Sequence, residues 1–176
     1  MAHRRVITGH DAHGRSVFVA DEQVEVIAPA AMPGASFNKL WGCDAVPSVP
    51  NRGVIPAHHA FFPAADGVRV ITFTLPPQGG PEPDPAQMDT AMAQLETKLP
   101  GLIAHMEPDN PGMHTTQTVD VDVVLSGEVD LELDDGAEVH LVPGDVVIQN
   151  GTRHRWHNRG SVPCTMLSVL VGARQG

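Results

Sequence analysis

The feature that most constrains the fold is a two-residue alternation of apolar and acidic side chains from Val129 to Leu133. In an extended strand such a run places its valine and leucines on one face and its acids on the other. Asp135-Gly136 then supplies a two-residue hairpin turn, and the apolar face resumes in Val139 to Leu141. The acids are therefore interpreted as the solvated face of a strand rather than a cation-binding surface.

Short strands separated by turns continue on both sides of this hairpin. Val68 to Leu75 alternates and reads as the first strand of the main sheet. Further strands are expected at 119–125, 146–148, 154–158 and 162–170. One helix interrupts them at Gln87 to Leu99, where apolar residues recur every three or four positions. This pattern predicts an all-β jelly-roll barrel over residues 68–176 with one inserted helix.

Residues 1–67 have a different sequence pattern from the predicted barrel. Strand candidates at 16–20, 24–27 and 36–43 alternate with loops that contain proline and glycine. This N-terminal extension is too thin to fold alone, so we expect it to pack on the barrel or on a partner subunit within a single domain. A strand-containing extension is also a natural source of an exchanged strand, which predicts a homodimer.

Composition narrows the class of protein. The 176 residues are 41% hydrophobic, enough for one core, and the net charge is −10 without a Lys/Arg cluster. These features argue against nucleic-acid and membrane partners, and no segment approaches the roughly 20 apolar residues of a membrane span. A cytoplasmic location is expected. Cys43 and Cys164 are far apart in sequence and are interpreted as buried thiols.

Two segments carry the candidate site residues. Leu141 to Asn158 contains a turn, a short apolar strand, a second turn and then a strand that bears His154. Upstream, Gly112 to Gly127 supplies His114 and Asp120. Two histidines and one acid on neighbouring strands predict a metal site.

These segments resemble the two motifs of the cupin superfamily. In the first motif His114 falls on the first histidine, Thr116 on the second, Asp120 on the glutamate and Gly127 on the last glycine. This motif is degenerate, because a hydroxyl replaces one ligand and another ligand is shortened. The second motif is matched by Pro143, Gly144, Gly151, His154 and Asn158, with Gln149 and Asn150 where the family usually has a proline. The resemblance implies a single-domain, RmlC-like cupin with a double-stranded β-helix.

Strand parity places the acids. Asp120 and Asp122 share one strand face, and His114 and Thr116 join it if the strand extends back without a bulge. Two acids on an inward face are costly unless a divalent metal, an arginine such as Arg69, or a protonated carboxyl compensates them.

The resemblance implies that His114, Asp120 and His154 hold a divalent transition metal. Two imidazoles, a carboxylate and open positions favour Fe(II), although Mn, Ni, Co or Zn also bind such sites. Thr116 would then bind a metal-bound water, and Trp156 would be an apolar wall that orients a substrate. His157 is out of phase with His154 and is expected to point outward, and the other histidines, His105 included, to lie on the surface or in loops.

Three functions follow as hypotheses. The first is a metal-dependent oxygenase of an aromatic or carbonyl-bearing metabolite. The second is a non-redox isomerase, cyclase, dehydratase or lyase in which Asp120, Asp122 and the histidines act as acids and bases. The third is a small-molecule binding protein without chemistry, suggested by Thr116 in the place of a histidine.

Overall fold

The computed structural model describes residues 2–176 and contains three antiparallel sheets and one α-helix. The strands are β1 (Arg4–His10), β2 (Ser16–Gln23), β3 (Ser36–Cys43), β4 (Val68–Leu75), β5 (Thr118–Ser126), β6 (Val129–Glu132), β7 (Glu138–Leu141), β8 (Val146–Asn150), β9 (Arg155–His157) and β10 (Cys164–Gly172). The helix is α1 (Met88–Lys98), and short 3-10 turns occupy Pro85–Gln87, Ile103–His105 and Asp134–Gly136. None of the helices in the described part is long and apolar enough to cross a membrane.

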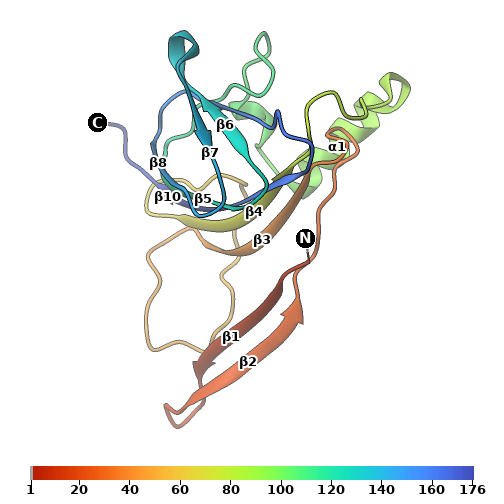
Figure 1. Ribbon diagram of the computed structural model, residues 1–176. Coiled ribbons are helices and arrows are strands. Elements are labelled where there is room, and N and C mark those ends of the chain that lie inside the picture. The colour runs from red at the N-terminus through yellow and green to blue at the C-terminus, as the bar shows by residue number, and fades with distance from the viewer. Residues whose placement is uncertain (1) are drawn as a thin grey trace.

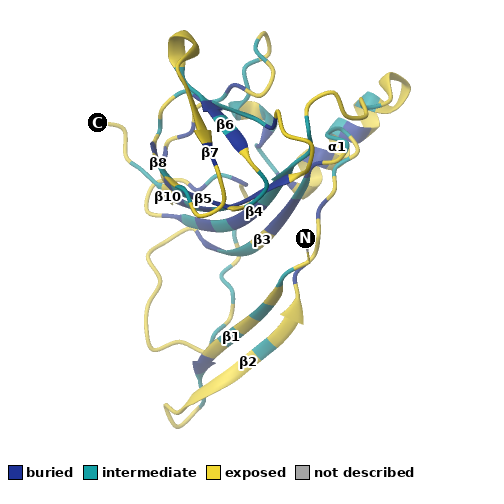
Figure 2. Ribbon diagram, viewed as in Figure 1, coloured by how far each residue is buried: buried dark blue, intermediate teal, exposed yellow. Residues whose placement is uncertain are grey.

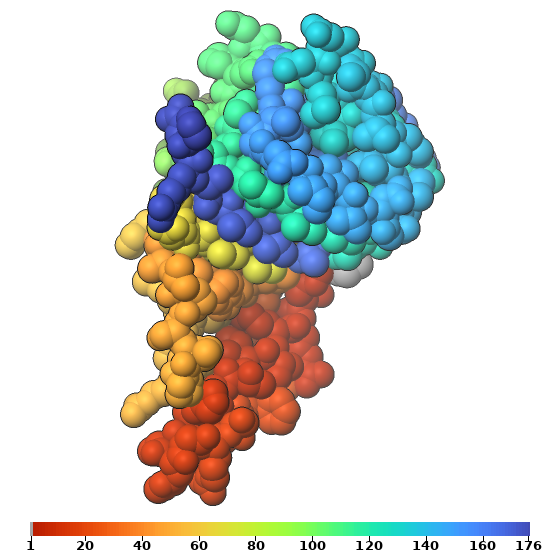
Figure 3. Space-filling view, turned by 90° about the vertical axis from the view of Figure 1, so that its left-hand side faces the viewer, coloured from red at the N-terminus to blue at the C-terminus, as the bar shows by residue number. Residues whose placement is uncertain are grey.

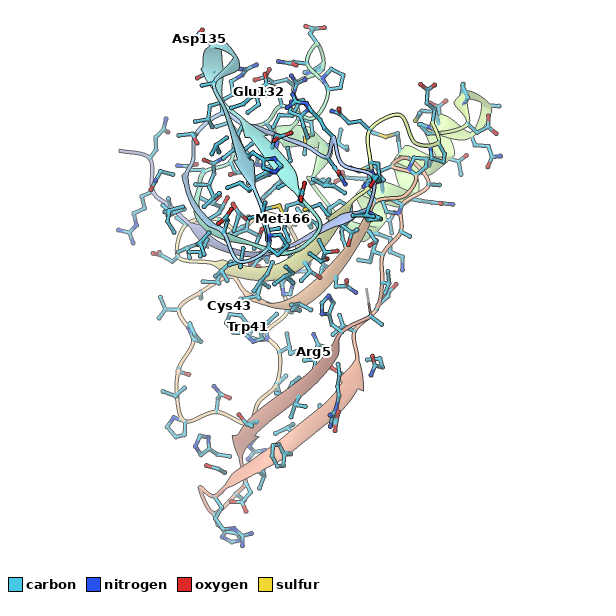
Figure 4. All side chains as sticks on the ribbon, in the orientation of Figure 1. Arg5, Trp41, Cys43, Glu132, Asp135 and Met166 are labelled. Atoms are coloured by element: carbon cyan, nitrogen blue, oxygen red, sulfur yellow. The ribbon has the colours of Figure 1, made fainter. Side chains whose placement is uncertain are left out.

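Two of the sheets face each other and form the barrel (Figure 1). One has five strands in the order β3-β4-β10-β5-β8, and the other has three in the order β7-β6-β9. Between them lies a cluster of buried side chains from both sheets, which includes Val124 of β5, Leu131 of β6 and Met166 of β10. Figure 4 shows Met166 inside the barrel. The chain therefore has the predicted all-β jelly-roll architecture.

Helix α1 packs beside the five-stranded sheet on the side where β3 and β4 lie (Figure 1). Its predicted apolar face is confirmed, because Leu95 and Leu99 are buried and Met92 packs on the same cluster. That cluster also contains Phe37 of β3, and Phe61 from the loop before β4. The helix thus stabilises the end of the five-stranded sheet where β3 and β4 lie.

The N-terminal residues form two separate structures. The β1–β2 hairpin projects away from the barrel and is largely exposed (Figures 1 and 2). Strand β3, by contrast, pairs with β4 inside the five-stranded sheet. Figure 4 labels Trp41 and Cys43 on β3, and Arg5 of β1 donates to the carbonyl of Leu40 in that strand at 2.7 Å. The domain division at residue 67 stays a prediction.

The strand predictions differ from the structure near the N-terminus, at residues 24–27 and at β1. Residues 24–27 are not a strand, and only Ile27 makes an isolated bridge, with Phe37. Strand β1 was not expected, because Arg4–His10 lacks a clean alternation. The turn at Asp135-Gly136 is confirmed, and both residues have positive φ angles, 57° and 71°. Cys43 and Cys164 are buried free thiols, as expected.

Candidate active site in the barrel cavity

A backbone pairing sets the positions of the two candidate histidines. The N–H of His114 donates to the carbonyl of His154 at 2.9 Å, and the N–H of His154 donates back to His114 at 2.9 Å. Residues paired in this way across antiparallel backbone project their side chains to the same face. The two imidazole rings consequently lie 4.1 Å apart between centroids.

Both imidazoles are held in one tautomer. Nδ1 of His114 lies 3.0 Å from the carbonyl oxygen of Gly112, and Nδ1 of His154 lies 2.9 Å from that of Thr152. A carbonyl oxygen only accepts, so each Nδ1 carries the hydrogen and each Nε2 keeps its lone pair. Burial lowers the pKa of His114, and burial together with the neighbouring His114 lowers the pKa of His154 to about 4. Both rings are therefore neutral at pH 7 and able to act as ligands or bases.

Two carboxyl groups lie on the sheet wall of the same cavity. Asp120 and Asp122 alternate on β5 and both point inward, as predicted from parity. Burial raises the pKa of Asp120 to about 7, against a smaller opposing effect of the Thr118 hydroxyl. Burial also raises the pKa of Asp122 to about 6, although the Ser168 hydroxyl donates a hydrogen bond to this carboxyl. The wall thus holds acids that exchange protons near neutral pH.

The cavity itself is small and mostly apolar. Its volume is about 160 Å³, close to the roughly 150 Å³ apolar cavity that binds benzene in an engineered protein. Its aromatic wall consists of Phe37, Phe61, Phe62, Phe73 and Trp156. Neither lysine nor arginine lines it among residues 2–176. The site therefore suits an uncharged ligand about the size of one substituted aromatic ring.

Most predicted site residues meet in this cavity. His114, Asp120, Asp122, His154 and Trp156 all line it, and the Trp156 and His154 rings are 5.7 Å apart in an edge-on arrangement. The exception is Thr116, whose buried hydroxyl instead bonds the Thr118 hydroxyl at 2.8 Å. The backbone bends at 117, so the strand does not extend back in phase to residue 116.

Arg69 does not compensate the carboxyl groups. Its buried guanidinium pairs with Asp44 at 2.5 Å and donates to the carbonyls of Cys43 and Ala60. Arg69 is therefore not the positive group that compensates the two buried acids. A protonated carboxyl, another of the three alternatives that the sequence left open, agrees with the raised pKa values of Asp120 and Asp122.

Several cavity residues were not anticipated. Ser168 is the one polar side chain that β10 points into the cavity. A serine inside an otherwise apolar strand was the feature of the sequence that could have indicated this role. Phe62 comes from a loop and packs against His105 in a tilted arrangement, with ring centroids 4.6 Å apart. His105, expected to be a surface or loop residue, therefore borders the cavity wall and contributes to the lowered pKa of His114.

The glycine and asparagine of the second motif have structural roles. Gly151 has a φ of 63°, and a Cβ there would lie 3.0 Å from the Thr116 carbonyl oxygen. A side chain at residue 151 would be strained by the positive φ and by the close carbonyl oxygen. Glycine therefore allows the turn that leads into His154. The Asn158 amide donates to the carbonyls of Leu75 and Val162, which fixes the end of this segment to β4.

The predicted metal site has the types of donor atom, imidazole nitrogen and carboxylate oxygen, that bind a divalent transition metal. Each imidazole offers a free Nε2, and Asp120 Oδ1 is buried with no hydrogen-bond partner in the described residues. In spacing, however, the ligand atoms of His114, Asp120 and His154 do not all lie within 4.8 Å of one another. Within residues 2–176 that spacing is met by Glu132, Glu138 and His157.

This second group lies outside the cavity and is already neutralised. Glu132 pairs with Arg155 and His157, and Glu138 pairs with Arg159. Figure 4 shows Glu132 on the three-stranded sheet. His157 thus does not line the cavity, in agreement with its predicted outward direction.

Comparisons with known proteins agree with the fold and the motifs. A cupin domain family model matches residues 103–170. Phomopsin biosynthesis cluster protein C' of Diaporthe leptostromiformis is 32% identical over 158 residues, which cover 88% of this chain and 70% of that protein. Cupin-domain-containing oxidoreductase fogC of Aspergillus ruber is 29% identical over 95% of this chain and 71% of its own length.

Among solved structures, an RmlC-like cupin family protein with a double-stranded β-helix fold from Methanocaldococcus jannaschii is 14% identical. It covers 60% of this chain and 70% of its own, with a TM-score of 0.39. Because a cupin domain model matches residues 103–170 and the relative that is 32% identical is covered over 70% of its own length, the chain belongs to the cupin superfamily.

Proposed function

We propose that this cupin is a metal-dependent enzyme that oxygenates an uncharged aromatic or carbonyl-bearing small molecule inside the barrel. The observation that carries this proposal is the pair of neutral imidazoles with free Nε2 atoms at one side of an apolar cavity. Relatives described as cupin-domain-containing oxidoreductases, such as fogC, support a redox reaction.

His114 and His154 would hold the metal, and Asp120 would complete the set once its side chain draws toward them. A redox-active metal such as Fe(II) would supply dioxygen chemistry at open coordination positions, and Mn, Ni, Co and Zn are the other candidates. The backbone carbonyls of Gly112 and Thr152 would keep the imidazoles oriented, because each accepts the hydrogen of an Nδ1.

The remaining cavity residues would bind and orient the substrate. Trp156 and Phe73, with ring centroids 6.5 Å apart, form an aromatic wall against which a planar ligand packs. The absence of lysine and arginine from the described cavity lining disfavours phosphorylated or carboxylated substrates, because a buried anion without a partner is costly. Asp122, held by Ser168, would accept or donate a proton at its carboxyl oxygen.

A second candidate function is a non-redox isomerase, cyclase, dehydratase or lyase. It is favoured by the raised pKa values of Asp120 and Asp122, about 7 and about 6, which suit general acid-base catalysis near neutral pH. A binding protein without chemistry is the third candidate, supported by Thr116 in the place of a ligand.

The test is metal analysis of protein purified without chelator. We expect about one transition-metal ion per chain, and loss of most of it in His114→Ala and in His154→Ala. His140→Ala, an exposed histidine on β7, is the matched control and should keep the metal. Stoichiometric metal that both cavity variants retain would place it elsewhere. Metal-free wild type that converts a substrate without oxygen would favour the acid-base enzyme instead.

A further inference from the structure

The sheet wall of the cavity is arranged in rows of paired residues. The β1–β2 hairpin, a separate protrusion in Figure 3, contributes none of the described lining residues. Strand pairing places Asp120 of β5 opposite Leu170 of β10 in one row. In the next row Asp122 lies opposite Ser168, and Ser168 lies opposite Ile71 of β4. Two residues along a strand span about 6.6 Å, so the two carboxyl groups are on different levels of the wall.

The level of Asp120 is the one nearer to the imidazoles. Asp120 lies opposite Gln149 at the end of β8, where the turn that leads to His154 begins. Asp122 is two residues further along β5, on the side away from that turn. The pair of Asp122 and Ser168 is therefore one row deeper in the barrel than the acid of the predicted metal site.

This deeper pair has one carboxyl oxygen without a partner. The Ser168 hydroxyl donates a hydrogen bond to Oδ1 of Asp122 and so fixes the carboxyl group. Within residues 2–176 no hydrogen bond reaches Oδ2. Asp122 is only 4% exposed and lines the cavity. A buried polar atom without a partner is costly, so Oδ2 is placed to bind a polar group of a ligand.

The chemistry of a carboxyl group indicates which polar group fits. An ionised carboxylate only accepts hydrogen bonds, and a protonated carboxyl also donates one. A hydroxyl group both donates and accepts, so it matches Asp122 in either state. A carbonyl oxygen matches the protonated state alone, and a methyl group matches neither. The deeper pair therefore favours a ligand that carries an alcohol or phenol hydroxyl.

The aromatic wall places the ring of such a ligand. The Trp156 ring lies 5.7 Å from the His154 ring and 6.5 Å from the Phe73 ring, between centroids. Phe73 is two residues beyond Ile71 on β4, so this wall extends from the imidazoles past the row of Ser168. A single ring packed on the wall fits the cavity of about 160 Å³. One end of that ring then faces the imidazoles, and a hydroxyl on it reaches the deeper row.

We propose that Asp122, held by Ser168, is a second polar anchor in the cavity and binds a hydroxyl group of an uncharged aromatic substrate. The substrate class is therefore an aromatic alcohol or a phenol. The inference rests on the proposed function for the reaction, which takes place at the end of the ring that faces His114 and His154. Binding of the hydroxyl group does not itself require a metal.

Calorimetric titration of the metal-free protein in chelator tests the anchor. The two ligands are benzyl alcohol and ethylbenzene, in which a methyl group replaces the hydroxyl. Asp122→Leu should weaken benzyl alcohol relative to ethylbenzene by at least about 10-fold, because leucine neither donates nor accepts. Asp122→Asn should keep most of the wild-type ratio, since an amide does both. Asp109→Leu makes the same substitution at an exposed loop residue and should leave the ratio unchanged.

A crystal structure of the wild type with benzyl alcohol locates the hydroxyl even where Asp122→Leu does not fold. We expect the hydroxyl oxygen within about 3 Å of Oδ2 of Asp122. The proposal is overturned by a hydroxyl bound at Nε2 of His114 or His154, or by a ratio that Asp122→Leu leaves at the wild-type value.

These results are separable from the test of the proposed function. A metal-loaded protein whose ligand ratio ignores Asp122 would lack the anchor and keep the metal-dependent chemistry. A protein that binds no metal but shows the expected ratio would keep the anchor and lose the oxygenase.

Discussion

Asp120 and Gln149 lie directly opposite each other on β5 and β8, and each has one buried polar atom without a hydrogen-bond partner in the described residues. The two atoms are complementary, since Asp120 Oδ1 accepts and Gln149 Nε2 donates. The other end of the Gln149 amide accepts a hydrogen bond from Thr152, which precedes His154 by two residues. The register of β5 and β8 therefore places the acid wall of the cavity beside the turn that positions an imidazole.

Burial of the Asp120 carboxyl makes the stability of the metal-free protein depend on pH. The pKa of Asp120 is raised to about 7 in the fold, from about 3.9 in an unfolded chain. A raised carboxyl pKa contributes stability that is complete below pH 4 and is lost as the pH rises through 7. We predict that Asp120→Asn gains stability relative to wild type over this window, by on the order of a few kcal/mol.

Urea unfolding at intervals from pH 4 to pH 8, with chelator present, measures this gain. Asp109→Asn replaces an exposed carboxylate and serves as the control, with a difference from wild type that stays nearly constant. An equally constant difference for Asp120→Asn would show that the Asp120 carboxyl is ionised in the fold throughout.

Gln149→Glu should destabilise the protein by roughly 1 to 3 kcal/mol at pH 8. The substitution keeps the oxygen that Thr152 uses but replaces the free amide donor by a second carboxylate opposite Asp120. A double-mutant cycle with Asp120→Asn measures the interaction, because the cost should shrink when Asp120 carries no charge. Additive effects of the two substitutions would mean that the side chains do not interact.

Leu95→Ala in α1 should cost about 2 to 5 kcal/mol of unfolding free energy. Leu95 is 1% exposed and belongs to the cluster that joins the helix to Phe37 and Phe61 of the cavity wall. The neighbouring Gln94→Ala is the control, since residue 94 is exposed and the change should be within about 0.5 kcal/mol. Chemical denaturation compares the two, and similar small losses would mean that the helix does not support the barrel.

The alternation of residues in the sequence predicted the features that depend only on the geometry of a single strand. The inward direction of Asp120 and Asp122 follows from alternation within one unbroken strand, and β3 and β4 have the predicted bounds. Thr116 shows the limit, because a bend at 117 shifts the phase that parity assumes. Nothing local in the sequence marks that bend.

Tertiary contacts determined the rest of the site. Arg69 pairs with Asp44 and donates to the carbonyl oxygens of Cys43, at the end of β3, and of Ala60, in the loop before β4. Strand parity does not predict these partners. Phe61 and Phe62 reach the cavity from the loop before β4, where no period applies. The imidazole rings of the motif residues His114 and His154 lie 4.1 Å apart, but the motif does not determine their spacing from Asp120.

The apolar, uncharged cavity lining predicts selectivity for neutral ligands in the metal-free protein. Trp156 lines the cavity and Trp41 does not, and these are the chain's 2 tryptophans, so Trp41→Phe leaves Trp156 as a single fluorescent reporter. We expect benzaldehyde to quench Trp156 and benzoate, a ring of the same size, to bind at least about 10-fold more weakly. The reason is that no lysine or arginine of the described lining compensates a carboxylate, and that ionised Asp120 or Asp122 would repel it.

Titrations at pH 8 in chelator, with free N-acetyltryptophanamide to correct for collisional quenching, measure the ratio of the two affinities. Equal affinities would require a positive group in the cavity and would return phosphorylated and carboxylated compounds to the candidate substrates.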